Sequence, residues 1–267
     1  MENTKTVLKI GFVGVGTMAS AIVRALISHS SKNMQIFLSP RSAERTKELA
    51  AASEIVTVTG SNQEVLDHAD WIILGVTPQV AEKVLPTLKF NKNHHLISLI
   101  SPVSLARIKE MVPAELAVNK VVPLPFIEHG TGPILLYPDN DEIYSLFSEL
   151  GHVVTVENEY QLDALITVTA LASPFYRVLS EVIDWGSEHD LSVEKSADYT
   201  LAFFDALLHR AQETDTNEIL DLWREMTPGG LNQRATQSLE ERSGFSMWHD
   251  ALDIVLDFFA DNDSKKD

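Results

Sequence analysis

The chain has 267 residues, of which 45% are hydrophobic and 22% charged, and its formal net charge is −17. This composition is typical of a globular protein and excludes a disordered chain. The absence of cysteine excludes disulfides, iron–sulfur clusters and thiolate zinc sites, and the lack of a basic patch predicts no nucleic-acid partner.

The first 158 residues alternate between short apolar runs and segments with helical spacing. Strands are predicted, in chain order, at 7–14, 34–38, 54–58, 70–76, 95–99, 117–122, 133–136 and 152–156, and helices at 17–29, 42–52, 63–68, 79–85, 105–111 and 142–150. Strands that alternate with helices of this length indicate βαβ units and a mostly parallel sheet. We therefore expect an α/β protein that begins with a Rossmann-like doubly wound sheet.

From residue 159 onward the pattern is helical. Helices are predicted at 160–185, with an interruption at Pro174, and at 193–210, 217–225, 231–242 and 245–259. The charge changes at the same point, from 13 basic and 16 acidic residues before it to 8 basic and 22 acidic residues after it. We expect two domains: an NAD(P)-binding Rossmann-like domain of residues 1–158, and an all-α dimerisation and substrate domain of residues 159–267.

The helix predicted at 160–185 is more apolar than a small solvated bundle requires. Asp163, Arg177, Glu181 and Asp184 interrupt its apolar face, so no membrane span is expected. We expect this helix to be buried in a homodimer, with exchanged helices, or in a higher homo-oligomer. The first residues show no signal-peptide pattern, and a cytoplasmic location is expected.

A glycine-rich turn follows the first predicted strand. Gly14 and Gly16, with Ala19 three residues further on, form a Gly-x-Gly-x-x-Ala motif that ends a strand and opens a helix. The first glycine allows a tight turn, the second lets the backbone approach a pyrophosphate, and the small third residue allows close packing. The pyrophosphate would contact the helix N-terminus at Thr17 and Met18. The motif therefore predicts a dinucleotide site.

The end of the second predicted strand indicates which dinucleotide binds. An NAD site has a carboxylate here, which binds the ribose 2′-hydroxyl. This chain has Ser39, Arg41 and Ser42 and no carboxylate. Because Arg41 would pair with a 2′-phosphate, we expect NADP as the cofactor, with NADPH preferred over NADH. The alternative is that Arg41 begins a helix and faces solvent.

Ligands in open α/β sheets bind beyond the carboxyl ends of the strands. The strand predicted at 70–76 ends in Val76, Thr77 and Pro78, which should therefore border the cofactor. The same argument adds Asn62, which follows the strand at 54–58.

A second glycine pair precedes the helix predicted at 231–242. Gly229 and Gly230, followed by Leu231 and Asn232, would expose backbone N–H groups to a carboxylate. The alternative is a simple loop punctuated by Pro228 and the two glycines. The nine histidines show no metal-binding spacing, and no metal is expected.

These segments together resemble the pyrroline-5-carboxylate reductase family. The resemblance extends from about residue 9 to residue 251 and is carried by 10–21, 39–42, 69–79, 162–176 and 227–245. It implies an N-terminal dinucleotide-binding domain, a helical dimerisation domain, and NAD(P)H-dependent reduction of the cyclic imine 1-pyrroline-5-carboxylate to L-proline, the last step of proline biosynthesis.

The cofactor half matches this family better than the substrate half. Asn232 stands where the family usually has Thr or Ser, and Thr77 stands where it usually has Lys. The segment 172–176 lacks the family's Gly-Ser-Gly run, and 122–125 departs from its Met-Pro-Asn-Thr-Pro loop. A divergent paralogue with a changed substrate is therefore an alternative.

The chemistry assigns Asn232 as the candidate catalytic residue. An imine that is already protonated needs orientation more than a strong general acid, and Asn232 would donate a hydrogen bond near it. Three alternatives remain. They are an NADP-dependent reductase of another small carboxylate, a β-hydroxyacid-type dehydrogenase, and a non-catalytic cofactor-binding protein. The β-hydroxyacid-type dehydrogenase is disfavoured because those enzymes use a lysine on the long interdomain helix, and residues 159–194 contain no lysine.

Overall fold

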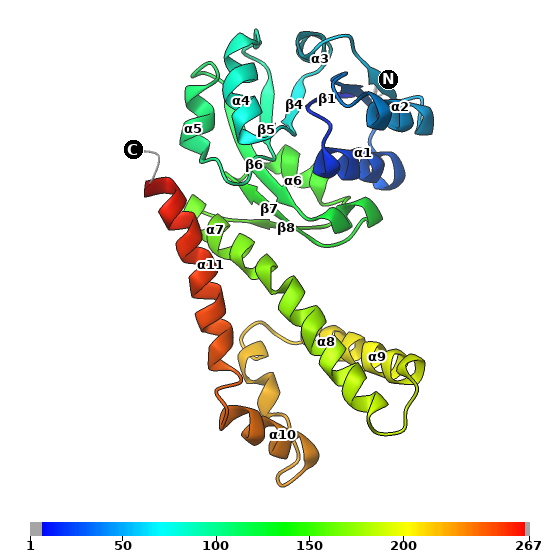
Figure 1. Cartoon of the computed structure of the whole chain (residues 1–267). Coiled ribbons are helices and arrows are strands. Elements are labelled where there is room, and N and C mark those ends of the chain that lie inside the picture. Colours follow the sequence, from blue (N-terminus) through cyan, green and yellow to red (C-terminus); the bar gives the residue numbers. More distant parts are fainter. Residues whose placement is uncertain (1–6, 265–267) are drawn as a thin grey trace, which may run out of the picture. The chain divides into compact units, whose positions relative to one another are not determined.

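The computed structural model describes residues 7–264 (Figure 1). Contacts within the chain divide it into two compact units, Met1–Leu162 and Asp163–Asp267. The predicted class is confirmed: a Rossmann-like sheet comes first and a helical part follows it. The domain bounds expected from the sequence, and the role of the helical part in dimerisation, remain predictions.

Unit 1 is built on one eight-stranded sheet. Its strands lie in the order β3-β2-β1-β4-β5-β6-β7-β8. They are β1 (Leu8–Val13), β2 (Met34–Leu38), β3 (Val56–Val58), β4 (Trp71–Leu74), β5 (His95–Ser98), β6 (Ala117–Pro123), β7 (Pro133–Tyr137) and β8 (His152–Thr155). The chain order reverses between β1 and β4, so the carboxyl ends of these two strands border the switch point at which such sheets bind ligands.

Helices cover both faces of this sheet (Figure 1). One face packs against α1 (Thr17–His29), α2 (Ala43–Ala52), the 3-10 helix η2 (Pro125–His129) and α6 (Asp141–Phe147). The other face packs against α3 (Asn62–His68), α4 (Pro78–Val84), the 3-10 helix η1 (Leu85–Thr87) and α5 (Leu105–Glu110). Because both faces are covered, central strands such as β4 are buried at every position, which explains their uninterrupted apolar runs.

Two strands of the sheet, β7 and β8, run against the other six. β7 pairs with β6 in the antiparallel sense, while the remaining pairs are parallel. The connection spans only residues 124–132, and a parallel crossover needs about a dozen residues or more. Gly130 and Gly132, both with positive φ, let this short connection turn back. The expectation of a mostly parallel sheet therefore holds with this one reversal.

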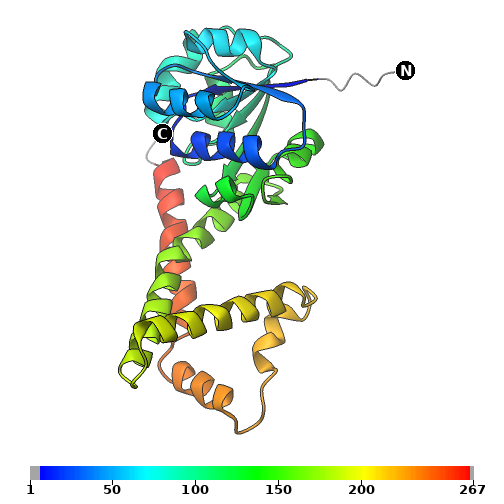
Figure 2. The same ribbon diagram turned by 90° about the vertical axis from the view of Figure 1, so that its right-hand side faces the viewer.

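The helical part contains α7 (Glu159–Val168), the 3-10 helix η3 (Thr169–Leu171), α8 (Ala172–Ser187) and α9 (Val193–Gln212), followed by the 3-10 helix η4 (Ile219–Arg224), α10 (Leu231–Glu240) and α11 (Ser246–Ser264). Within unit 2, α8 packs against α9 and α11 contacts η3. Figure 2 shows these pairs from a second direction.

Two details of the helical part refine the sequence pattern. The interruption expected at Pro174 in the helix predicted at 160–185 lies at η3, which ends three residues before that proline, because a proline ring clashes with the carbonyl four residues earlier, here that of Ala170. The helix predicted at 217–225 is instead the 3-10 helix η4. Leu220 and Trp223 in η4 are exposed, so no tertiary packing stabilises a longer α-helix there.

Among the described residues, the helical stretch Glu159–Ser187 is long and apolar enough to cross a membrane by length and composition, and 17% of its apolar window is buried. A buried helix of a soluble assembly passes the same test, so this property is weak evidence for a membrane span.

Candidate cofactor site and substrate loop

The turn after β1 has a geometry that only glycine accepts at its first position. Gly14 has φ +90°, and a Cβ there would overlap the Val76 side chain and lie 2.8 Å from the carbonyl oxygen of Gly75. A Cβ on Gly75 would in turn lie 2.5 Å from the carbonyl oxygen of Gly14. The ends of β1 and β4 therefore approach each other so closely that both need glycine.

Gly16 has a different role from Gly14. It is the N-cap of α1, and a Cβ built on it would meet only the Gly75 carbonyl oxygen, at 3.6 Å. The fold itself therefore tolerates a side chain at position 16, and the need for glycine there comes from what approaches the loop from outside.

The first turn of α1 leaves backbone donors available. The amide of Ser20 donates to the Gly16 carbonyl, whereas those of Thr17, Met18 and Ala19 have no hydrogen-bond partner among the described residues. The first turn contains no acidic residue. Unpaired N–H groups at the start of a 13-residue helix favour an anion, so the residues present fit a pyrophosphate.

Ser39 holds the glycine turn from the neighbouring strand. It follows β2, is almost fully buried, and its Oγ accepts a hydrogen bond of 2.9 Å from the Gly14 amide. Its own amide donates to the Phe12 carbonyl. Ser39 therefore stabilises the conformation of the glycine turn through hydrogen bonds within the chain.

The start of α2 carries two arginines. Arg41 is exposed and has no partner among the described residues, and the adjacent Ser42 is the N-cap of α2 without a side-chain capping bond. Arg45 is half-buried, and its Nη1 donates to the Val15 carbonyl of the glycine turn at 3.3 Å. A cavity of about 440 Å³ lies here, lined by Ser42, Arg45 and their neighbours.

Two carboxylates share that cavity. Glu48 is neutralised by Arg24, whose Nη2 lies 2.6 Å from Glu48 Oε1. Glu44 has no cationic partner among the described residues, and it lies in the first turn of α2. Arg45 therefore shares the cavity with one unbalanced carboxylate, Glu44, while Arg41 lies next to Ser42 in the chain but outside the cavity lining.

The remaining sequence-predicted cofactor residues lie at the carboxyl ends of β3 and β4. Asn62 is the first residue of α3 and is half-buried. Val76 contacts the Gly14 position, and Thr77 is the exposed N-cap of α4, whose first residue is Pro78. The Thr77 side chain makes no capping bond and is free for a ligand.

A buried lysine lies on β6, two strands away from β4 in the sheet. Lys120 of β6 pairs in register with Ser98, the last residue of β5, and its side chain is 2% exposed. Its Nζ lies 3.0 Å from Glu159 Oε1 and donates to the Ser101 carbonyl at 3.3 Å. The same Glu159 oxygen accepts from the Leu105 amide at 2.8 Å. This network fixes the loop after β5.

The glycine pair of unit 2 forms a tight turn before α10. Gly229 has φ +73°, and its amide donates to Gln233 Oε1 at 2.5 Å. The Gly230 amide donates to the Thr227 carbonyl at 2.9 Å. The amides of Leu231, Asn232 and Gln233 have no partner among the described residues, and the Asn232 side chain is exposed. The donors left for an anion are therefore these three, while the glycines shape the turn.

The sequence did not single out Gly75 or Arg45 as site residues. Gly75 stands at the end of a predicted strand, so its position was a usable signal. Arg45 was not recognisable because its place depends on how α2 returns to the glycine turn. Among residues 7–264, no group of three or more His, Cys, Asp or Glu side chains is arranged to hold a metal ion.

Comparisons with known proteins relate the chain to NAD(P)-dependent oxidoreductases. Residues 9–102 match the family model described as NADP oxidoreductase, coenzyme F420-dependent. A pyrroline-5-carboxylate reductase of Staphylococcus haemolyticus is 26% identical over 201 residues, which are 70% of this chain and 72% of that protein. One of Pseudomonas aeruginosa is 25% identical over 262 residues, 92% of this chain and 94% of that protein.

A solved structure shares the fold. The Plasmodium falciparum pyrroline carboxylate reductase with NADP bound has a TM-score of 0.78 and 22% identity, and the match covers 98% of this chain and 99% of that one. The resemblance indicated by the sequence motifs is confirmed, as is the enzyme class, an NAD(P)-dependent oxidoreductase.

Proposed function

We propose, from the premise that the chain is related to the pyrroline-5-carboxylate reductases, that it reduces 1-pyrroline-5-carboxylate to L-proline with NADPH, in proline biosynthesis. The observation that carries the proposal is the glycine turn, whose conformation is fixed by Gly14, Gly75 and Ser39 and whose helix offers unpaired amides. Such a turn fits the pyrophosphate of a dinucleotide.

NADPH is proposed over NADH because of charge at the end of β2. Arg41 and Arg45 carry two positive charges beside Ser42, and no carboxylate stands at the strand end where an NAD site has one. A guanidinium binds a 2′-phosphate through paired N–H donors. The related Plasmodium falciparum protein, which was solved with NADP bound, supports the same choice.

The turn before α10 is proposed to hold the substrate carboxylate. The Leu231 and Asn232 amides are, with that of Gln233, the donors without partners among the described residues, and Gly229 and Gly230 give the turn its shape. The Asn232 side chain is proposed to donate a hydrogen bond that orients the ring of the imine. An amide does not titrate in the working range, so Asn232 is a catalytic residue by orientation and not by proton transfer.

The bound cofactor would supply a hydride to the imine carbon. The residues of this chain would bind the pyrophosphate and the 2′-phosphate and hold the substrate carboxylate, so that the reacting atoms meet in one orientation. A substrate that enters as the protonated imine needs no further proton at nitrogen during hydride transfer.

A homodimer or higher homo-oligomer through the helical part is also proposed. Among the described residues of unit 2, Leu179 is the only hydrophobic side chain that is buried, while Trp185 is 61% exposed and Leu220 81%. Such an apolar surface is far larger than monomers usually expose. Light scattering at micromolar concentration should give at least twice the monomer mass of 29.6 kDa. The expected location is cytoplasmic, without a nucleic-acid or membrane partner.

The decisive experiment follows NADPH oxidation with pyrroline-5-carboxylate, beside a panel of other cyclic imines and small keto acids. Turnover that is fastest with pyrroline-5-carboxylate supports the proposal. Faster turnover of another carboxylate substrate would assign a paralogue with changed specificity. NADPH binding by calorimetry without turnover on any compound would instead assign a non-catalytic cofactor-binding protein.

A further inference from the structure

The loop between β5 and α5 follows the carboxyl end of β5 and spans residues 99–104. Ile100 and Val103 of this loop are buried in the apolar core. Ser101 is half-buried and Pro102 is exposed, and these two residues form the tip of the loop. The base of the loop is therefore packed, while its tip is accessible to a ligand at this edge of the sheet.

The sheet topology indicates which half of a dinucleotide this tip would face. β5 lies next to β4, on the side of the switch point that is away from β2. A doubly wound sheet binds one mononucleotide half of its ligand on each side of the switch point. Since the 2′-phosphate belongs to the adenosine half and is proposed to bind at the end of β2, the nicotinamide half would lie on the side of β4 and β5.

The tip of the loop is tied to β6 by the buried Lys120. The Lys120 side chain is 2% exposed, and its Nζ donates to the Ser101 carbonyl at 3.3 Å and lies 3.0 Å from Glu159 Oε1. The same Glu159 oxygen accepts from the Leu105 amide, where the loop enters α5. The pair of Lys120 and Glu159 therefore holds the loop at its tip and at its end.

The geometry of this pair matters more than its net charge or its contribution to stability. The two charges cancel, so the pair adds no net charge beside the loop. Apolar residues of similar volume usually stabilise a fold as well as a buried ion pair does. Apolar residues could not, however, donate a hydrogen bond to the Ser101 carbonyl, and this bond fixes the position of the tip.

We propose that Lys120 and Glu159 are positioning residues for the nicotinamide half of the cofactor, because they fix the loop against which that half would lie. This inference rests on the proposed binding of NADPH. Lys120 is buried, so it would act through the loop and not by contact with the ring. A displacement of a reacting atom by about 1 Å can slow a reaction about a hundredfold, so a loop held in one place has a direct effect on hydride transfer.

The test compares the native chain with Lys120→Met, which loses the donor to Ser101, and with Lys120→Arg, which keeps a donor. NADPH is the probe. Calorimetry should give the same number of sites and Kd values that agree within about twofold, because the phosphates are bound elsewhere. The fluorescence lifetime of bound NADPH lengthens when the nicotinamide ring is held rigidly. This lifetime should fall toward that of free NADPH in Lys120→Met and remain native in Lys120→Arg.

The kinetic measurement uses pyrroline-5-carboxylate with the same three proteins. In Lys120→Met, kcat should fall about tenfold or more, while KM for the imine stays within about twofold of the native value. The double variant Lys120→Met/Glu159→Gln leaves no buried charge unpaired and should therefore fold. It should show the same loss of lifetime and of kcat, since it also lacks the donor to Ser101.

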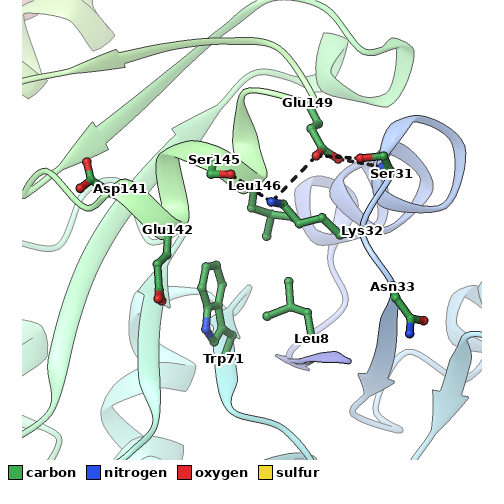
Figure 3. A pocket seen from close by; sticks show the side chains of 10 residues that line it. All are labelled: Leu8, Ser31, Lys32, Asn33, Trp71, Asp141, Glu142, Ser145, Leu146 and Glu149. Carbon is green, nitrogen blue, oxygen red and sulfur yellow. Dashed lines mark hydrogen bonds and ion pairs between the residues drawn. The ribbon is translucent and has the colours of Figure 1, made fainter. Parts of the chain in front are cut away.

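Lys32→Met is the matched control, since it removes an ion-paired lysine of unit 1 that precedes β2, at the amino ends of the strands. Lys32 Nζ donates to Ser145 Oγ at 3.0 Å and lies 3.9 Å from Glu149 Oε1 (Figure 3). Burial alone would raise the pKa of Glu149, but hydrogen bonds from Ser30 and Ser31 and the charge of Lys32 outweigh it, and the pKa is lowered. Lys32→Met therefore breaks an ion pair far from the β5 loop, and the lifetime of bound NADPH should remain native.

A native lifetime in Lys120→Met, or an equal loss of lifetime in Lys32→Met, would overturn the inference. If the native chain bound NADPH but reduced no imine, the proposed reaction would be wrong, and the lifetimes would still decide whether Lys120 positions the nicotinamide half. If calorimetry showed no NADPH binding by the native chain, the proposed function and this inference would both be overturned.

Discussion

Lys120 Nζ and Glu159 Oε1, 3.0 Å apart, form an ion pair whose two partners differ sharply in burial. The lysine side chain is 2% exposed and that of the glutamate 29%. Glu159 begins α7 and also accepts from the Leu105 amide at the start of α5. One carboxylate therefore joins β6, α5 and α7, and the cost of breaking the pair depends on which charge is left behind.

We expect Glu159→Ala to destabilise unit 1 more than Lys120→Met. The first variant leaves a buried ammonium unpaired and should cost about 3–5 kcal/mol of unfolding free energy. The second leaves a partly solvated carboxylate that keeps the Leu105 amide, and should cost about 1–3 kcal/mol. Urea unfolding measures both, with the exposed Lys109→Met as a control that changes little. A larger loss of unfolding free energy in Lys120→Met than in Glu159→Ala would contradict this prediction.

The two glycines of the turn should separate stability from binding. Gly14→Ala forces a side chain into the left-handed region and against Val76, and should lower the unfolding free energy by about 1–3 kcal/mol. Gly16→Ala has room in the free protein and should unfold like the native chain, yet bind NADPH much more weakly, because its methyl group occupies the path of the pyrophosphate. Calorimetry of NADPH binding beside thermal unfolding checks both. If Gly16→Ala bound NADPH with native affinity, the pyrophosphate would not contact this turn.

Arg41→Gln and Arg45→Gln should each weaken NADPH binding about tenfold and leave NADH binding unchanged, since only NADPH has the 2′-phosphate. Lys47→Gln removes one positive charge from an exposed position on α2 and serves as the control. The Kd values of NADPH and NADH, measured for each variant at low and high salt, test this prediction. Equal losses for NADH would mean that the arginines act on the fold or on the adenosine.

Asn232→Ala should lower kcat/KM for the imine substrate about tenfold or more, through loss of an orienting hydrogen bond, while the Kd for NADPH stays constant. Gln237→Ala lies further along α10 and is exposed, so it provides a matched control. Steady-state kinetics with pyrroline-5-carboxylate give the comparison. Unchanged kcat/KM would exclude Asn232 from the reaction.

The lowered pKa of Glu149 predicts a stability term that depends on pH. A carboxyl group whose pKa is lower in the folded state stabilises that state above its unfolded pKa, and the contribution disappears as the pH falls through the folded pKa. Glu149→Gln should therefore be less stable than the native chain at neutral pH, and the difference should shrink in acid. Urea unfolding across this pH range measures it. A difference that stays constant with pH would show that the charge of Glu149 is not involved.

The sequence predicted most of unit 1 because its signals are local. Apolar runs mark the buried strands, and the glycine motif lies within nine residues of one strand end. What depends on pairing between distant segments was missed. Ser39 was expected to meet the cofactor, but its Oγ also accepts from Gly14, because β1 and β2 are neighbours. Arg45 reaches the turn through the return of α2 toward β1.

The bond from the Gly14 amide to Ser39 has a consequence for how a nucleotide is captured. The bond lies within the chain and ties the turn to the end of β2, so we expect nucleotide binding to require little ordering of the backbone. The affinity is then expected to lose little to chain entropy.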